Sequence, residues 1–106
     1  MAETKRIALV TGAGSGIGRA VSIPLRAAGF CVVLAGRRRE ELERTASLAK
    51  ASAGKMLAVS TDESDARSVR RLFEQIKTTY ARLDVLFNDA GTTLRNLCNL
   101  IISITS

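Results

Sequence analysis

The sequence TGAGSGIG, residues 11–18, is the strongest structural signal in this chain. It lies between an apolar, β-branched run, Ile7–Val10, and a helical stretch from about Gly16 to Ala28, which Gly29 ends. A short and wholly apolar run is typical of a strand that is buried on both faces of a parallel sheet. The glycine-rich stretch is therefore expected to be the turn from a buried strand into a helix.

The glycines of this turn have the spacing that a phosphate-binding loop needs. Gly12 permits the tight turn, and Gly18 lets the helix pack against the sheet. Gly14 and Gly16 let the backbone come close to a phosphate. The free N–H groups and the positive end of the following helix then face an anion. The alternative interpretation is a flexible connection between two elements.

The rest of the chain alternates between strand and helix patterns. Apolar runs predict further buried strands at Cys31–Ala35, Met56–Val59 and Val85–Phe87. Apolar residues at helical spacing predict one helix from Glu40 to about Ala51 and another after an N-cap at Asp65. The apolar stripe of the helix after Asp65 comprises Val69, Leu72, Phe73 and Ile76. The pattern predicts an α/β fold, a Rossmann-type doubly wound parallel sheet with helices on both faces.

Pro24 lies inside the first expected helix. Proline removes a backbone hydrogen bond and crowds the preceding turn, at a cost of about 3 kcal/mol if nothing relieves it. We therefore expect a kink or an early stop there, and not the loss of the helix.

The glycine spacing also carries a family resemblance. TGxxxGIG, with Gly12, Gly16 and Gly18, resembles the fingerprint of the short-chain dehydrogenases/reductases. The resemblance continues through VVLAGRR (32–38), the aspartates Asp62 and Asp65, and LDVLFNDAG (83–91). It implies that residues 1–91 are a dinucleotide-binding Rossmann domain, truncated after about four strands because a full family member is much longer.

The residues after the second expected strand indicate which dinucleotide would bind. NAD-binding Rossmann domains have an acidic residue there, which holds the ribose 2′-hydroxyl. This chain has Gly36, then Arg37 and Arg38. A guanidinium group binds a 2′-phosphate that a carboxylate would repel. We expect NADP, with NAD as the alternative, and we favour Arg37 over Arg38 for the phosphate contact. Alternatively, both arginines begin a solvent-facing helix.

Further cofactor contacts are implied by the resemblance. Asp62 matches the family aspartate whose side chain meets the adenine, and Glu63 would offer only backbone. Residues 88–91 match the family's Asn-Asn-Ala-Gly, but Asp89 replaces the second Asn, so that an amide becomes an acceptor only. The expected cofactor-binding residues are Gly12, Gly14, Ser15, Gly16, Ile17, Gly18, Arg37, Arg38, Asp62, Glu63, Asn88, Ala90 and Gly91.

The resemblance implies hydride transfer between NADP(H) and a carbonyl or alcohol substrate. In the family, a Tyr acts as general acid/base with a Lys four residues later, aided by a Ser and an Asn. The only tyrosine here, Tyr80, is followed four residues later by Asp84, so we expect a packing residue and no turnover by this chain alone. If Ile101–Ser106 is the family's fifth strand, Ser106 matches the catalytic Ser. We favour the alternative, in which residues 92–106 are an unrelated apolar tail that pairs with a bare sheet edge.

Composition limits the remaining function classes. The net charge of +6 suggests a nucleic-acid partner, but most of the basic residues lie scattered on expected helix faces, so we expect none. No apolar stretch approaches the roughly 18 residues that a membrane span needs. Two isolated cysteines, Cys31 and Cys98, and the lack of a signal peptide favour a cytoplasmic protein, and we expect no metal site. The alternatives to an oxidoreductase portion are an inactive nucleotide-binding or docking module and a non-functional fragment.

Overall fold

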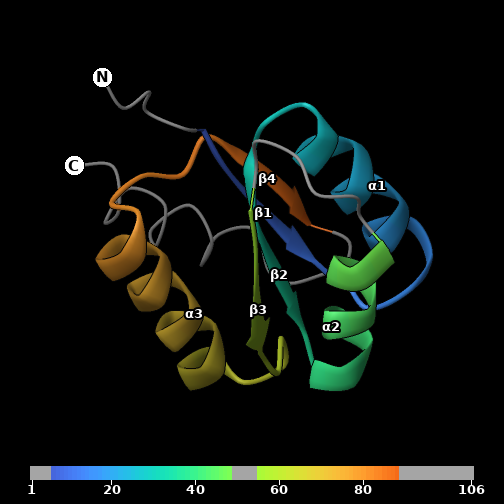
Figure 1. Cartoon of the computed structure of the whole chain (residues 1–106). Helices are drawn as coiled ribbons and strands as arrows, with labels where there is room; N and C mark the ends of the chain where they lie inside the picture. Colours follow the sequence, from blue (N-terminus) through green and yellow to red (C-terminus); the bar gives the residue numbers. More distant parts are fainter. Residues whose placement is uncertain (1–5, 49–54, 89–106) are drawn as a thin grey trace.

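The computed structural model describes residues 6–48 and 55–88 (Figure 1). These residues form four strands and three helices in strict alternation. Each predicted strand is present and extends one residue further than expected at its C-terminal end. Asp89, Ala90, Gly91, the tail 92–106 with Ser106, and the expected end of the second helix lie outside the described residues. The elements are β1 (Ile7–Thr11), α1 (Gly16–Ala27), β2 (Cys31–Gly36), α2 (Arg39–Leu48), β3 (Met56–Ser60), α3 (Ala66–Thr79) and β4 (Val85–Asn88).

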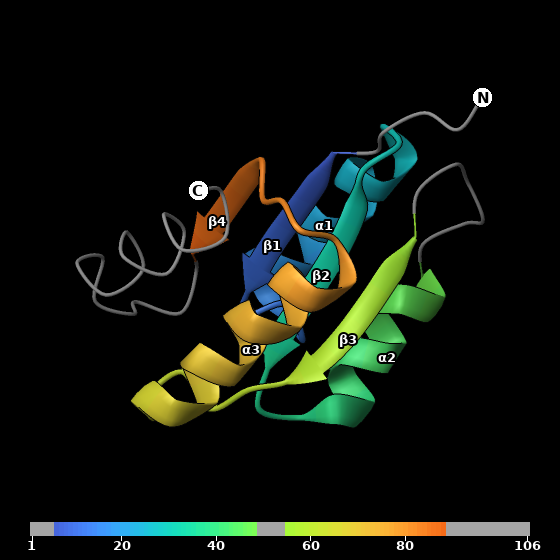
Figure 2. The same cartoon turned by 90° about the vertical axis from the view of Figure 1, so that its left-hand side faces the viewer.

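The four strands form one parallel sheet in the order β3-β2-β1-β4. Figure 2 shows β3 at one edge of this sheet and β4 at the other. The last residue of β1, Thr11, is in register with Ala35 of β2 and Asn88 of β4. The carboxyl ends of the three strands therefore lie side by side. The predicted Rossmann-type α/β fold is confirmed.

Helices cover both faces of the sheet, as predicted, with α1 and α2 on one face and α3 on the other (Figure 1). Alternate residues of β1 and β2 point to opposite faces, so both strands are buried completely. Leu9 and Val33 pack toward α3, whereas Val10 and Leu34 pack toward α1 and α2. The predicted apolar stripe of α3 is buried, with exposed fractions of 6% or less at Val69, Leu72, Phe73 and Ile76.

Helix α1 does not stop at Pro24 but continues to Ala27. Pro24 is exposed, so its ring projects into solvent and displaces no core side chain. Its carbonyl still accepts a bond from the Ala28 N–H at 2.9 Å, which completes the last turn. Gly29, with φ +99°, then ends the helix. The expected kink stays a prediction.

Asp84 joins the start of β1 to the segment before β4. Its Oδ2 accepts from the Ile7 N–H at 2.7 Å, and its own N–H donates to the Ile7 carbonyl at 2.8 Å. The Arg82 guanidinium donates to both carboxylate oxygens, at 2.6 and 2.9 Å. The Arg82 bonds, followed by the Ile7 N–H, hold the pKa of Asp84 below its usual value. The ionised carboxylate is therefore the form that stabilises this corner of the sheet.

Asp84→Asn is expected to lower the free energy of unfolding by about 1 kcal/mol at pH 7, because the pair is only partly shielded from solvent. A lowered pKa means that this stabilisation is complete above the unfolded pKa of about 3.9 and is lost as the pH falls through the folded value. Denaturant titrations at a series of pH values should therefore show the difference between parent and variant shrinking below about pH 4. The exposed Glu74→Gln is the matched control and should change little. An Asp84→Asn difference that stays constant down to pH 2.5 would contradict this assignment.

Candidate nucleotide-binding site

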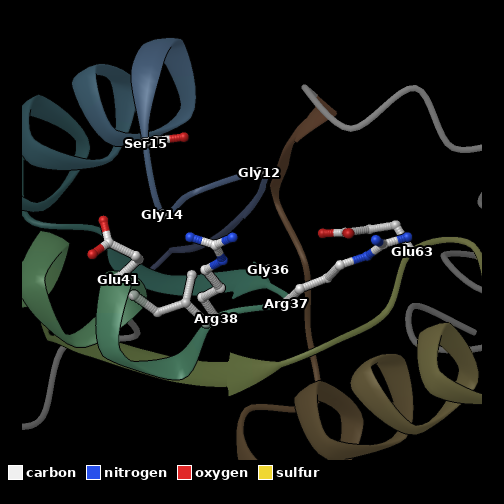
Figure 3. Close-up of a pocket in the computed structure, with 9 residues that line it drawn as sticks. Gly12, Gly14, Ser15, Gly36, Arg37, Arg38, Glu41 and Glu63 are labelled. Atoms are coloured by element: carbon white, nitrogen blue, oxygen red, sulfur yellow. The ribbon is translucent and has the colours of Figure 1, made fainter.

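A pocket of about 260 Å³ opens at the carboxyl ends of β1 and β2 (Figure 3). It lies next to the position where the strand order reverses around β1, which is where open parallel sheets bind ligands. The lining residues come from the β1–α1 loop, the end of β2, the β2–α2 loop, the start of α2 and the loop that follows β3. They are Gly12, Gly14, Ser15, Gly36, Arg37, Arg38, Glu41, Leu42 and Glu63.

Gly12 and Gly18 shape the start of the glycine loop and its contact with α1. Gly12 has φ +63°, a conformation that L side chains rarely adopt. At Gly18, an added Cβ would lie 2.2 Å from the Gly12 carbonyl oxygen. Gly18 therefore brings α1 against the backbone of the loop itself. The sequence predicted only that Gly18 lets the helix pack against the sheet, so the structure adds the loop backbone at Gly12 as the group in contact.

The N-terminus of α1 has no side-chain cap. Ser15 occupies the N-cap position in an extended conformation, its side chain makes no capping bond, and the first turn has no acidic residue. Helix α3 differs, because its predicted N-cap, Asp65, accepts from the Arg67 N–H at 2.9 Å. The first turn of α2 carries Glu40 and Glu41. The positive end of α1 therefore remains suited to an external anion.

Three side chains that the sequence did not single out hold the glycine loop against α2. The Thr45 hydroxyl donates to the Ala13 carbonyl at 2.7 Å and accepts from Arg19 Nε at 2.9 Å. Arg19 also forms an ion pair with Glu41, at 3.2 Å. These contacts join residues 22 to 32 positions apart, so no local pattern in the sequence could have revealed them.

The two arginines that follow β2 both line the pocket but differ in their partners. Arg37 Nη2 lies 3.3 Å from Asp62 Oδ1 and donates to Ser64 Oγ at 3.3 Å. Within the described residues, Arg38 forms no hydrogen bond or ion pair through its side chain, and Figure 3 shows its guanidinium pointing toward the glycine loop at Gly14. Among the described residues, the pocket thus holds one guanidinium group that is paired with a carboxylate, that of Arg37, and one without a partner, that of Arg38.

The loop that follows β3 presents its two acidic residues differently. Asp62 does not line the pocket. Its Oδ1 accepts from the Ser64 N–H at 3.0 Å and from Ser64 Oγ at 2.6 Å. These bonds, aided by Arg37, hold the pKa of Asp62 below its usual value. Glu63 does line the pocket, and its Oε1 is buried without a hydrogen-bond partner among the described residues.

Among the described residues, the other members of the expected cofactor site do not line this pocket; they are Gly16, Ile17, Gly18 and Asn88. Thr11 Oγ1 donates to Asn88 Oδ1 at 2.9 Å, which joins the ends of β1 and β4. Ile17 is 63% exposed on the first turn of α1 and, like Gly16, is not among the lining residues. Tyr80 follows the last residue of α3 and is half-buried against the core, and burial raises the pKa of its hydroxyl. Tyr80 is therefore a packing residue in this structure.

The strand order and the glycine loop define a Rossmann-type protein with a candidate nucleotide site. Residues 6–101 match the short chain dehydrogenase family, and the chain belongs to that family. Within the described part of the chain, no helix is long and apolar enough to span a bilayer.

Relatives and solved structures agree with this assignment. The chain is 41% identical over 91 residues to an oxidoreductase of Staphylococcus aureus strain MW2, an alignment that covers 86% of this chain and 38% of the relative. A short chain dehydrogenase from Bacillus anthracis superposes with a TM-score of 0.76 at 29% identity, covering 82% of this chain and 35% of its own. A metagenomic short-chain oxidoreductase in complex with NADP gives a TM-score of 0.72 at 31% identity, covering 76% and 36%. The chain therefore spans 38% of the length of the Staphylococcus aureus oxidoreductase.

Gly18→Ala is expected to lower the free energy of unfolding by about 2–3 kcal/mol, because the new methyl group must push α1 away from the loop. Gly16→Ala is the matched control, since a Cβ there meets no heavy atom within 4 Å and only the positive φ of +54° opposes it. That control should cost about 1 kcal/mol. Denaturant unfolding of both variants gives the comparison, and equal losses would show that the close approach at Gly18 is not a constraint.

Proposed function

We propose that this chain binds NADP(H) and is the cofactor-binding portion of an oxidoreductase that transfers hydride between NADP(H) and a carbonyl or alcohol substrate. In this proposal, residues 1–91 act as the dinucleotide-binding domain. The main observation behind this proposal is that the Arg38 guanidinium, which has no partner among the described residues, lies in the same pocket as the uncapped N-terminus of α1. Two cationic features at the carboxyl ends of adjacent parallel strands suit a ligand with two separate phosphate groups.

The pyrophosphate is assigned to the glycine loop. Gly12, Gly14 and Ser15 line the pocket beside the first turn of α1, and the missing Cβ atoms of the two glycines let phosphate oxygens approach the N–H groups. Gly16, Ile17 and Gly18 would contribute through the backbone of that turn. Asn88 would steady the neighbouring strand end through its bond with Thr11.

The 2′-phosphate is assigned to the two arginines. Gly36 ends β2 without a carboxylate, so nothing at that position repels a phosphate. Glu41 carries a negative charge on the same wall, but its ion pair with Arg19 offsets that charge. The sequence favoured Arg37 for the phosphate contact, whereas the geometry favours Arg38, because Asp62 and Ser64 already hold Arg37.

The likeness to a relative in complex with NADP supports the choice of cofactor. Proton transfer is not assigned to this chain, because its single tyrosine, Tyr80, packs against the core and has no lysine four residues later. The substrate class of the whole protein therefore depends on residues other than those described here.

Arg38→Ala is expected to weaken NADPH binding by about tenfold or more and to leave NADH binding within about twofold, because only NADPH carries the 2′-phosphate. Calorimetric titration of each variant with both nucleotides measures this difference. Arg37→Ala should reduce NADPH affinity less than Arg38→Ala does.

Arg39→Ala is the matched control, since Arg39 begins α2 outside the pocket and pairs with Glu43 at 3.8 Å. It should leave both affinities unchanged. An Arg38→Ala variant that binds NADPH as the parent does, or that loses NADH equally, would contradict the proposal.

A further inference from the structure

We propose that Arg19 raises the preference of the site for NADPH over NADH by neutralising the carboxylate of Glu41. This inference rests on the proposed function, which assigns a 2′-phosphate to the pocket that Glu41 lines. An unpaired negative charge on that wall would repel the phosphate. Arg19 is not among the lining residues, so it is a positioning residue that acts on the ligand through Glu41.

Glu41 lies where a negative charge affects a bound phosphate. It belongs to the first turn of α2, and its Cβ lies 3.1 Å from the position that a Cβ at Gly14 would take. Its side chain is 39% exposed, so a ligand can approach it. Figure 3 shows the Glu41 carboxylate and the Arg38 guanidinium between the start of α2 and the glycine loop. A phosphate bound by Arg38 beside that loop would therefore lie near both charges.

Arg19 reaches Glu41 from α1 and is fixed by several contacts. Its Nη2 lies 3.2 Å from Glu41 Oε2 and donates to the Glu41 backbone carbonyl, also at 3.2 Å. Its Nε donates to the Thr45 hydroxyl at 2.9 Å, which limits the movement of the guanidinium. Within the described residues, no other cation forms an ion pair with Glu41. Removal of Arg19 alone would therefore leave an unpaired carboxylate in the pocket.

The two nucleotides respond to such a carboxylate in opposite ways. It repels the 2′-phosphate of NADPH, whereas the 2′-hydroxyl of NADH can donate a hydrogen bond to it. In NAD-binding Rossmann domains, an acidic residue after the second strand makes that hydrogen bond. Here β2 ends at Gly36, and Glu41 is the carboxylate that follows it on the pocket wall. The ion pair with Arg19 therefore keeps Glu41 from favouring NADH.

The test is a cycle of variants in which calorimetric titration measures the ratio of NADPH affinity to NADH affinity. Arg19→Gln should lower this ratio by about tenfold, because an unpaired carboxylate close to a phosphate weakens its binding by about that factor. The double variant Arg19→Gln, Glu41→Gln should return the ratio to within about threefold of the parent, since the repelling charge is gone. Arg19→Lys keeps a cation beside Glu41 and should keep the parent's ratio.

Arg26→Gln is the matched control. Arg26 is a second arginine of α1 that reaches α2, where its Nη1 donates to the Ala46 carbonyl at 3.4 Å, and it does not line the pocket. Its replacement should leave the ratio unchanged. A merely structural role of Arg19 would weaken the binding of both nucleotides equally, so that the ratio would not change in Arg19→Gln either.

Each result has a definite meaning. An unchanged ratio in Arg19→Gln would overturn the inference and leave the proposed function intact. A ratio that stays low in the double variant would also overturn it, because Arg19 would then act on the phosphate without Glu41. A parent that binds neither nucleotide would overturn the proposed function together with the inference. Thermal melts show whether each variant is folded, and Arg19→Met, which keeps the aliphatic stem, takes the place of an unfolded Arg19→Gln.

Discussion

The backbone contact between Gly18 and Gly12 fixes the geometry on which the candidate site depends. The carbonyl of Gly12 occupies the space where any other residue at position 18 would place its Cβ, at 2.2 Å. This contact puts the first turn of α1 directly over the carboxyl end of β1, with its N–H groups uncapped. The hydroxyl of Thr45 then holds the loop from the side of α2, through the Ala13 carbonyl. If α1 began further from the loop, its first N–H groups would lie further from the pocket, and their partial positive charge would act less strongly on a bound anion.

In the described part of the chain, the charged side chains that line this pocket are paired, with two exceptions. Glu41 is paired with Arg19, and Arg37 is paired with Asp62. The exceptions are Arg38 and Glu63, which enter the pocket from different elements. Because the Arg38 guanidinium keeps its hydrogen-bonding capacity for a ligand, it accounts for the proposed phosphate recognition.

The sequence predicted the elements well because the signals are local. Apolar runs marked four strands to within one residue at their C-terminal ends, and Asp65 marked the start of α3. An early stop at Pro24 was not found, because the exposed ring sits in the last turns of α1 and the following N–H groups still bond. The sequence also named most of the pocket-lining residues. It missed the Arg19–Thr45 contact and the buried oxygen of Glu63, because tertiary packing creates both and no spacing encodes them.

The proposed function requires that the glycine loop receive the phosphates of a dinucleotide. Amide proton–nitrogen correlation spectra of the labelled chain, recorded during titration with NADPH, locate binding residue by residue. We predict the largest shifts at the amides of Gly14, Gly16 and Gly18 and at Arg38, with little change along α3. Saturable shifts confined to α3, or none at the loop in a chain that remains folded, would contradict the proposed function.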